Sequence, residues 1–434
     1  MTRAAGWVVT IGDELLRGEI VDSNKAFLSE RLLRLDLETE RHLTVPDEAG
    51  AIEEALGEAA RRARVVLVSG GLGPTRDDIT TEVAARTFGR KLIRNAQILE
   101  GIRGFFRSIG REMSENNAKQ ADFPEGAEPL PNPIGTAPGF MLEAEGARLF
   151  FMPGVPRELY RMVDEQVLPR IAAGLDRSGV VRATILRTFG IGESTLDREL
   201  DDVARDDPDV TLGFRTQFPD NLLRVVARAP TAGEASRKLA NVVGEIRTRL
   251  GPIVLGEGER PLKMIVGELL IEEEKTIAVA ESCTGGLLAG ALTDTPGSSA
   301  YLLEGIVAYS DTAKMRDLGV PAELIEEHGA VSEEVAALMA QGIRERSGAD
   351  IGISTTGIAG PGGGTTDKPV GTVVIGLSDA EGTVARRYQL MTDRVRNREL
   401  TVHAALDWIR RRILGLEIPG ETFPRGKLPG RESA

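Results

Sequence analysis

The stretch KTIAVAESCTGGLLAGAL occupies residues 275–292. Its first part, residues 275–280, is apolar and partly β-branched and predicts a strand, whereas the small apolar residues 286–292 predict a helix. Ser282 falls in the tight turn between them. A hydroxyl in such a turn is exposed, and the free N–H groups of the first helical turn point to where an oxyanion would develop. We therefore expect an α/β domain with a nucleophile at this turn.

A lysine further along the chain is a candidate base for this serine. Lys314 follows Tyr309 and a second apolar strand at residues 305–308. A lysine partly removed from water beside a serine can be neutral near pH 7 and accept its proton, which gives a Ser–Lys pair without histidine. Two alternatives stay open, since Ser282 could be a helix cap and Lys314 an ordinary surface charge.

A glycine-rich loop follows the strand predicted at residues 350–354. Residues 354–372 read STTGIAGPGGGTTDKPVGT. Glycines allow backbone N–H groups to approach a phosphate closely, so this loop is a candidate ligand-binding segment. A plain flexible hairpin loop is the alternative.

These motifs occur together with PGSSAYLLEGIVAYSDTAK at residues 296–314 and HGAVSEE at residues 328–334. Over about residues 260–415 the combination resembles the C-terminal domain of the CinA (competence/damage-inducible) family, whose enzymatic form is nicotinamide mononucleotide deamidase. The resemblance implies hydrolysis of the nicotinamide carboxamide to nicotinic acid mononucleotide and ammonia. It implies the catalytic residues Ser282, Lys314 and Tyr309. Oxyanion and substrate contacts are expected at Thr284, Gly285, Gly286, Gly357, Gly360 and Gly362.

A second strand, glycine loop and helix occur in the N-terminal part of the chain. Residues 65–69 predict a strand, and residues 70–78 continue with GGLGPTRDD. This order places N–H groups and a helix dipole on a phosphate. The adjacent Asp77 and Asp78 suit a divalent metal that bridges phosphates. A tight turn for the glycines and a helix cap for Asp78 are the alternatives.

Two further motifs accompany this loop, GDELLRGEIVDSN at residues 12–24 and FMPGVPREL at residues 151–159. Together they resemble the molybdopterin-binding-like domain that CinA proteins carry at their N-terminus. The resemblance implies metal-dependent ADP-ribose pyrophosphatase activity, which gives AMP and ribose 5-phosphate. We expect the metal at Asp77 and Asp78. Phosphate contacts are expected at Gly70, Gly71, Gly73, Thr75, Glu14, Asn24 and Gly154.

The segment between these regions, residues 173–252, predicts a small separate α/β unit. It resembles the KH-like spacer domain of the family, although its loop at residues 190–193 reads GIGE and is not a GxxG nucleic-acid clamp. We therefore expect an α/β protein with two three-layer domains, residues 1–172 and 258–415, joined by this KH-like domain. Residues 416–434 predict a disordered tail.

The polar segment at residues 94–119 has a helical pattern and carries several basic side chains. Arg103, Arg107, Arg111 and Lys119 could line a nucleotide cleft. A solvated helix face is the simpler interpretation.

Composition limits the remaining possibilities. A formal net charge of −13 over 434 residues argues against a broad nucleic-acid or anionic-membrane surface. The single cysteine, Cys283, rules out an internal disulfide and a Cys-based zinc site. Cys283 is itself an alternative nucleophile, and His328 is an alternative base. We find no apolar run of about 18 residues, so we expect a cytoplasmic protein.

The expected ligands are small nucleotides, nicotinamide mononucleotide and ADP-ribose, without membrane or nucleic-acid partners. A divalent metal is expected in the N-terminal domain and no cofactor in the C-terminal one, and the resemblance implies a homodimer. Two alternatives remain. One domain could be active while the other only binds nucleotide, or the chain could be a non-enzymatic interaction protein associated with competence.

Overall fold

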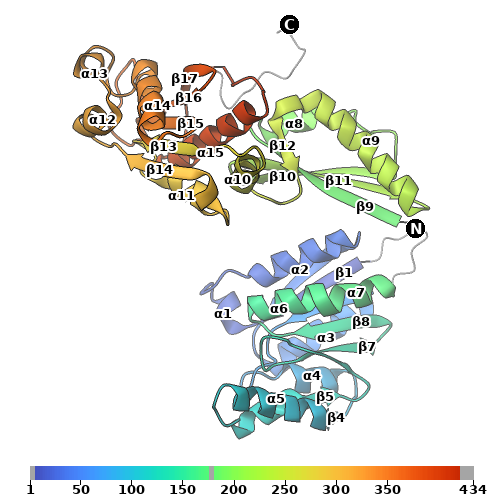
Figure 1. Ribbon diagram of the computed structural model, residues 1–434. Helices are drawn as coiled ribbons and strands as arrows, with labels where there is room; N and C mark the ends of the chain where they lie inside the picture. The colour runs from blue at the N-terminus through green and yellow to red at the C-terminus, as the bar shows by residue number, and fades with distance from the viewer. Residues whose placement is uncertain (1–4, 175–179, 421–434) are drawn as a thin grey trace. The chain divides into compact units, whose positions relative to one another are not determined.

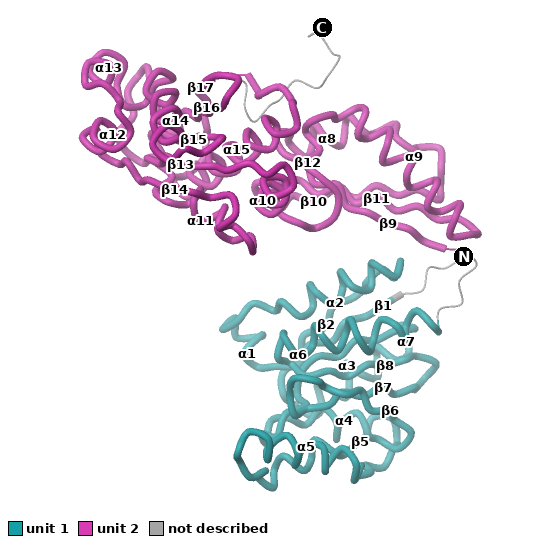
Figure 2. Tube along the Cα trace, viewed as in Figure 1, with its two compact units in different colours: residues 1–178 teal, residues 179–434 magenta. Residues whose placement is uncertain are grey.

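The computed structural model describes residues 5–174 and 180–420. They belong to two compact units, Met1–Ser178 and Gly179–Ala434 (Figure 2). No helix in the described ranges is long and apolar enough to cross a membrane. Residues 421–434 of the predicted tail lie outside these ranges.

The first unit, coloured from blue to green in Figure 1, contains a six-stranded sheet. The order of its strands is β2-β1-β3-β8-β7-β6. Its four parallel strands are β1 (Ala5–Ile11), β2 (Glu38–Val45), β3 (Val65–Ser69) and β8 (Ala147–Met152). Two antiparallel strands complete it, β7 (Gly139–Ala144) and β6 (Glu128–Leu130). All five residues of β3 are buried, which accounts for its unbroken apolar sequence, VVLVS.

Helices cover both faces of this sheet. On one face, Leu67 of β3 packs with apolar residues of α2 (Ser23–Arg34), α6 (Pro156–Met162) and α7 (Leu168–Ala173). On the other face, Val66 and Val68 pack with α3 (Ala49–Arg62) and α4 (Thr80–Thr87). The remaining elements are α1 (Asp13–Leu16), the π-turn η2 (Val163–Val167), β4 (Leu92–Arg94), α5 (Ala96–Ser108), the 3₁₀ helix η1 (Glu115–Ala121) and β5 (Asp122–Pro124).

The second unit contains a five-stranded sheet of order β14-β13-β15-β16-β17. Its strands are β13 (Ile277–Glu281), β14 (Leu302–Val307), β15 (Ile351–Gly357), β16 (Thr372–Asp379) and β17 (Gly382–Gln389). One face packs against α10 (Leu262–Glu272), α11 (Leu287–Thr293) and α15 (Arg394–Ile413). The other face packs against α12 (Asp311–Leu318), α13 (Ala322–His328) and α14 (Glu333–Ser347).

The same unit contains a smaller sheet of order β10-β11-β9-β12. Its elements are β9 (Val180–Thr188), α8 (Glu193–Leu200), β10 (Val210–Gln217), β11 (Asp220–Ala229), α9 (Ala232–Leu250) and β12 (Val254–Glu257). Thr231 and Glu234 form a capping box at the start of α9. The predicted class, two three-layer α/β domains joined by a small α/β domain, is confirmed.

A buried group of charges joins the smaller sheet to α15. Asp220, which is 3% exposed, lies between Arg187 of β9 and His403 of α15. Its Oδ1 is 2.6 Å from Nε2 of His403, and Arg187 also donates to the carbonyl oxygen of Glu259 over 2.9 Å. The ring of Phe189 packs edge-on against His403, with centroids 4.4 Å apart. Asp220 thus links the two sheets of the second unit.

Asp220→Ala should lower the free energy of unfolding of the second unit by about 3–5 kcal/mol, because it leaves the buried Arg187 without its anion. The measurement uses a Trp7→Phe background, because Trp7 lies in the first unit and Trp408 in the second. In this background, tryptophan fluorescence during urea unfolding reports on the second unit alone. Asp209→Ala, which removes an exposed ion pair with Lys238, is the control and should cost about 1 kcal/mol or less. Equal stability of the Asp220→Ala and parent chains would contradict this account.

Candidate active site

Ser282 lies directly after the buried strand β13, at the carboxyl end of the sheet. Its side chain is almost buried, which corrects the exposed hydroxyl expected from the sequence, and its N–H donates to the carbonyl oxygen of Thr355 over 2.9 Å. The N-cap of α11 is Gly286. Ser282 is therefore not the cap of this helix, and its hydroxyl is available for another role.

Lys314, on α12, points at this hydroxyl. The lysine is 1% exposed, and its Nζ lies 3.4 Å from Oγ of Ser282. Nζ also donates to the carbonyl oxygens of Ala308, over 3.1 Å, and Tyr309, over 3.3 Å. Lys314 is therefore a buried partner of Ser282, and the surface-charge alternative does not describe it.

The surroundings of Lys314 favour the neutral amine. Burial lowers the pKa of Lys314 below its usual value, while the carboxylate of Asp311, 3.8 Å away, opposes this shift. A neutral amine has two N–H groups and one lone pair. When the carbonyls of Ala308 and Tyr309 accept the two N–H groups, the lone pair is left for Ser282. This arrangement suits a base that accepts the proton of Ser282.

Glu281 holds the turn in place, a role that the sequence analysis missed. Its carboxylate is 1% exposed and accepts from three backbone N–H groups at the start of α11, those of Gly286, Leu288 and Ala289, over 2.8–3.0 Å. A carboxylate suits this position because the N-terminus of a helix carries partial positive charge. The sequence signal was an acidic residue between a buried strand and a helix of small residues.

This contact corrects the expected oxyanion donors. The N–H of Gly286 donates to Glu281, and the N–H of Gly285 donates to the carbonyl of Ser282 over 3.1 Å. Both groups are therefore occupied. Within the described part of the chain, no carbonyl or carboxylate group accepts from the N–H groups of Cys283 and Thr284, which lie near the thiol of Cys283. They are the donors that this turn offers to an oxyanion.

Side chains from elsewhere fix this segment further. The hydroxyl groups of Thr284 and Thr355 are both fully buried and share a hydrogen bond of 2.6 Å. Arg398 of α15 donates to the carbonyl oxygens of Cys283, over 3.1 Å, and Thr284, over 2.8 Å. The carbonyl groups of the turn are thereby held in place.

Tyr309 and the glycine-rich loop meet through Arg394. Tyr309 is 61% exposed, and its hydroxyl accepts from Arg394 over 3.4 Å, while the same guanidinium donates to the carbonyl of Gly360 over 2.7 Å. Gly362 is exposed in the same loop. Gly357, which was expected in the loop, instead ends β15 and pairs with Val373. Gly357 therefore has a role in sheet packing.

The two alternative catalytic residues do not fit the geometry. Cys283 is buried, and burial raises the pKa of its thiol to about 12, so the reactive thiolate is scarce. His328 ends α13 with its Nδ1 3.8 Å from a carboxylate oxygen of Glu334. No hydrogen bond in the described ranges connects His328 to Ser282.

In the first unit, the predicted phosphate-binding glycines lie in the loop after β3. The N–H of Gly70 donates to the carbonyl of Met152 at the end of β8, over 3.0 Å. A Cβ atom on Gly70 would lie 2.2 Å from the carbonyl oxygen of Ile11, and one on Gly71 would lie 2.0 Å from Oγ1 of Thr80. Only glycine fits such close packing, which brings the loops after three parallel strands together.

Asn24 fastens these loops to each other. Its Nδ2 donates to Oγ of Ser69 over 3.0 Å and to the carbonyl of Gly154 over 2.7 Å. Asn24 is nearly buried. The structure thus places Asn24 and Gly154, both predicted as phosphate contacts, side by side with the start of the glycine loop.

The predicted metal ligands differ in their surroundings. Asp77 is exposed, whereas Oδ2 of Asp78 accepts from the N–H of Thr75 over 2.8 Å and from its hydroxyl over 2.6 Å. The N-cap of α4 is Ile79, so Asp78 does not cap that helix. Oδ1 of Asp78 takes part in neither hydrogen bond. Among the described residues, no group of three or more His, Cys, Asp or Glu side chains is arranged to hold a metal.

Carboxylates nonetheless converge on this edge of the sheet. Burial raises the pKa of Asp47, which follows β2, and the charges of Glu14, Asp13 and Asp77 act in the same direction. Asp13 and Glu14 begin α1 directly after β1, Asp47 follows β2, and Asp77 lies in the loop after β3. Glu14 and Asp77 were expected at this site from the sequence, whereas Asp13 and Asp47 were not, because only the parallel sheet brings these residues together.

Three family models match consecutive parts of the chain. They describe a probable molybdopterin binding domain at residues 7–173, a damage-inducible protein CinA KH domain at residues 183–256 and a CinA C-terminal domain at residues 259–413.

Individual relatives match nearly the whole chain. A CinA-like protein of Citrifermentans bemidjiense is 46% identical over 407 residues, 94% of this chain and 97% of that protein. A CinA-like protein of Dictyoglomus thermophilum is 41% identical over 409 residues, 94% of this chain and 99% of that protein. The solved structure of a CinA protein of unknown function from Thermoplasma acidophilum is 30% identical, covers 40% of this chain and 99% of its own, and has a TM-score of 0.37.

The single cysteine offers a direct check on this site. Because Cys283 is buried and its pKa is raised, we expect the folded protein to react with a thiol reagent such as Ellman's reagent far more slowly than the same protein in guanidinium chloride. The unfolded chain should release one equivalent of dye. Fast stoichiometric reaction of the native protein would contradict the burial of this thiol.

Proposed function

The chain belongs to the CinA family, and from this premise we propose that its C-terminal domain hydrolyses the carboxamide of nicotinamide mononucleotide. The products would be nicotinic acid mononucleotide and ammonia. One observation carries the proposal: Nζ of the buried Lys314 lies 3.4 Å from Oγ of Ser282. A weak nucleophile beside a base that is kept from water is the arrangement that covalent catalysis of acyl transfer requires.

In the proposed first step, Oγ of Ser282 attacks the carboxamide carbon while Nζ of Lys314 accepts the hydroxyl proton. The carbonyl oxygen becomes an oxyanion. The N–H groups of Cys283 and Thr284 would stabilise it, and the fixed carbonyls of the turn reduce the reorganisation needed. Because the N–H of Cys283 directly follows the nucleophile, it corresponds to the donor position in other nucleophile turns.

In the second step, the C–N bond breaks and ammonia leaves with the proton held by Lys314. A water molecule then attacks the acyl ester on Ser282, and Lys314 accepts a proton from this water. The C–O bond to Ser282 breaks, its oxygen regains the proton, and the free carboxylic acid is released. Each proton taken up by Lys314 is therefore returned.

The substrate phosphate or ribose would lie against Tyr309 and the loop that contains Gly360. Arg394 adds a positive charge to this part of the site, since its guanidinium donates to the carbonyl of Gly360 and to the hydroxyl of Tyr309. An arginine matches a phosphate in geometry as well as charge. This arrangement agrees with a mononucleotide substrate.

Ser282→Ala and Lys314→Met should each lower kcat/KM for ammonia release from nicotinamide mononucleotide by about a thousandfold or more, because nucleophile and base act as a unit. A coupled ammonia assay on the full chain, without added metal, measures this. Cys283→Ala is the matched control, one residue along, and should keep activity within about tenfold. Near-normal turnover in either of the first two variants would refute the pair.

For the N-terminal unit we propose metal-dependent hydrolysis of ADP-ribose to AMP and ribose 5-phosphate. A divalent ion such as Mg²⁺ takes one or two protein carboxylates and leaves its other positions to phosphates and water. Asp77 and Oδ1 of Asp78 suit that requirement, and the converging carboxylates near Asp47 favour a cation. Such an ion would neutralise the diphosphate. The glycine loop would supply N–H groups to the same group.

Asp77→Asn should lower the rate of metal-dependent cleavage of ADP-ribose by about a hundredfold or more, because it removes the charge of a proposed metal ligand. AMP formation at a fixed Mg²⁺ concentration is the measurement. Glu125→Gln, an exposed carboxylate of the same unit, is the control and should leave the rate unchanged. An undiminished rate in Asp77→Asn would rule out this placement of the metal.

A further inference from the structure

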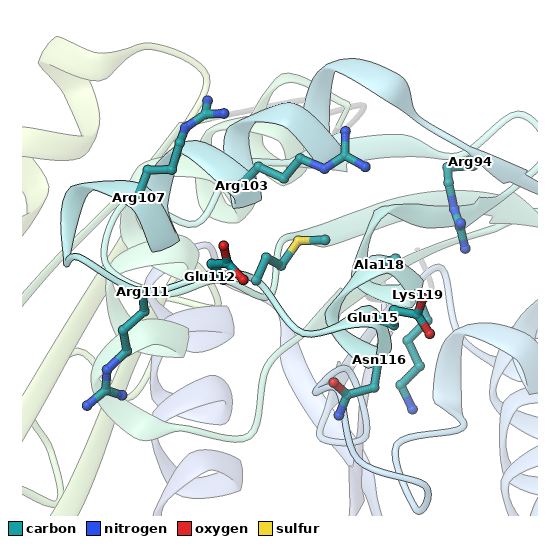
Figure 3. A pocket seen from close by; sticks show the side chains of 10 residues that line it. Arg94, Arg103, Arg107, Arg111, Glu112, Glu115, Asn116, Ala118 and Lys119 are labelled. Carbon is teal, nitrogen blue, oxygen red and sulfur yellow. The ribbon is translucent and has the colours of Figure 1, made fainter.

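A cavity of about 760 Å³ lies in the first unit, between α5 and the segment that leads through η1 (Figure 3). Arg103 and Arg107 extend from α5 on one side, and Asn116 and Lys119 lie across from them. The lining contains five cationic side chains and two carboxylates, a net charge of three positive. The charged residues of this arginine pocket are Arg94, Arg103, Arg107, Arg111, Lys119, Glu112 and Glu115.

The lining is positive in a chain whose net charge is −13, although two carboxylates outside the lining, those of Asp122 and Glu100, pair with three of its arginines. Arg94 is held by two hydrogen bonds of 2.7 Å to Asp122. Arg103 and Arg107 share one carboxylate, that of Glu100, and about half or more of each arginine side chain is exposed. Exposed ion pairs of this kind are weak, so these arginines can turn to an anionic ligand at little cost.

The arginine pocket adjoins the glycine loop of the proposed pyrophosphatase site. Nζ of Lys119 donates to the carbonyl of Asp78 over 3.0 Å and also to that of Thr75. Nδ2 of Asn116 donates to the carbonyl of Pro74 over 3.2 Å. The helix η1 therefore both lines the arginine pocket and holds the loop. A ligand whose diphosphate lies on this loop can continue into the pocket.

The size and chemistry of the arginine pocket limit its ligand. Small-molecule sites typically enclose about 300–1,000 Å³, so this volume suits part of a nucleotide. Guanidinium groups bind phosphate through paired hydrogen bonds, and several of them around one cavity favour a doubly charged phosphate monoester. In the proposed function, the N–H groups of the glycine loop and a bound metal would serve the diphosphate. The arginines would then be available to a further phosphate.

We infer that the arginine pocket binds a phosphate group in addition to the diphosphate, so that the N-terminal site prefers nucleotides that carry an extra phosphate on a ribose. This inference rests on the proposed function of that site. It assigns Arg103, Arg107 and Arg111 to substrate specificity, whereas Asp77 and Asp78 serve the reaction itself.

The test compares the binding of ADP-ribose and of its 2′-phosphorylated derivative to the full chain by calorimetry at constant ionic strength. The wild-type protein should bind the 2′-phosphorylated nucleotide about tenfold or more tightly, since hydrogen bonds to charged groups contribute at least that much. The triple variant Arg103→Gln, Arg107→Gln, Arg111→Gln should lose this preference and retain its affinity for ADP-ribose.

The matched control is the triple variant Arg61→Gln, Arg62→Gln, Arg64→Gln. It removes the same charge at exposed positions just before β3, at the amino ends of the parallel strands. It should keep the preference. Equal affinities of the wild type for the two nucleotides, or a preference that survives in the arginine-pocket variant, would overturn the inference.

The experiment can distinguish an error in the proposed pyrophosphatase function from an error in the proposed phosphate binding by the arginine pocket. If ADP-ribose is neither bound nor cleaved, the proposed pyrophosphatase function fails, and inorganic tripolyphosphate becomes the probe. Binding of tripolyphosphate that is lost in the arginine-pocket variant but not in the control supports the pocket. No binding to the wild type overturns it.

Discussion

Parallel strands bring their carboxyl ends to one edge of a sheet, and both three-layer domains of this chain place their candidate sites at such an edge. In the second unit, the edge gathers the turn after β13, the loop after β15 and Lys314, which follows β14. In the first unit, it gathers the loops after β1, β2, β3 and β8. Residues far apart in the sequence become neighbours for this reason alone.

Burial of charge then gives the C-terminal site its chemistry. The buried side chain of Glu281 accepts hydrogen bonds from three N–H groups at the start of α11, and this fixes the turn that carries Ser282. Lys314 has carbonyl partners close by and a carboxylate only at 3.8 Å, so burial favours its uncharged form. Glu281 therefore fixes the turn, and the amine of Lys314 is placed to accept a proton.

Much of this could be predicted from the sequence. The strand VVLVS and the turn at Ser282 were predicted from local pattern, because an unbroken apolar run and a strand-to-helix switch are visible without tertiary contacts. The occupied N–H groups of Gly285 and Gly286 were not predicted. The N–H of Gly285 is taken up by the carbonyl of Ser282 in the folded turn, and the side chain of Glu281 reaches the N–H of Gly286 only when the helix starts beside it. For the basic side chains of residues 94–119, the sequence left a nucleotide cleft open but favoured a solvated helix face, because the return of η1 across α5 leaves no local signal.

If Lys314 acts as a neutral base towards Ser282, its loss of a proton should control the pH dependence of kcat/KM for nicotinamide mononucleotide. Because burial lowers the pKa of Lys314, kcat/KM should rise about tenfold per pH unit at low pH and level off at a pH below the usual lysine pKa of about 10.4. A kcat/KM that stays constant, or that falls as the pH rises through this range, would contradict the account.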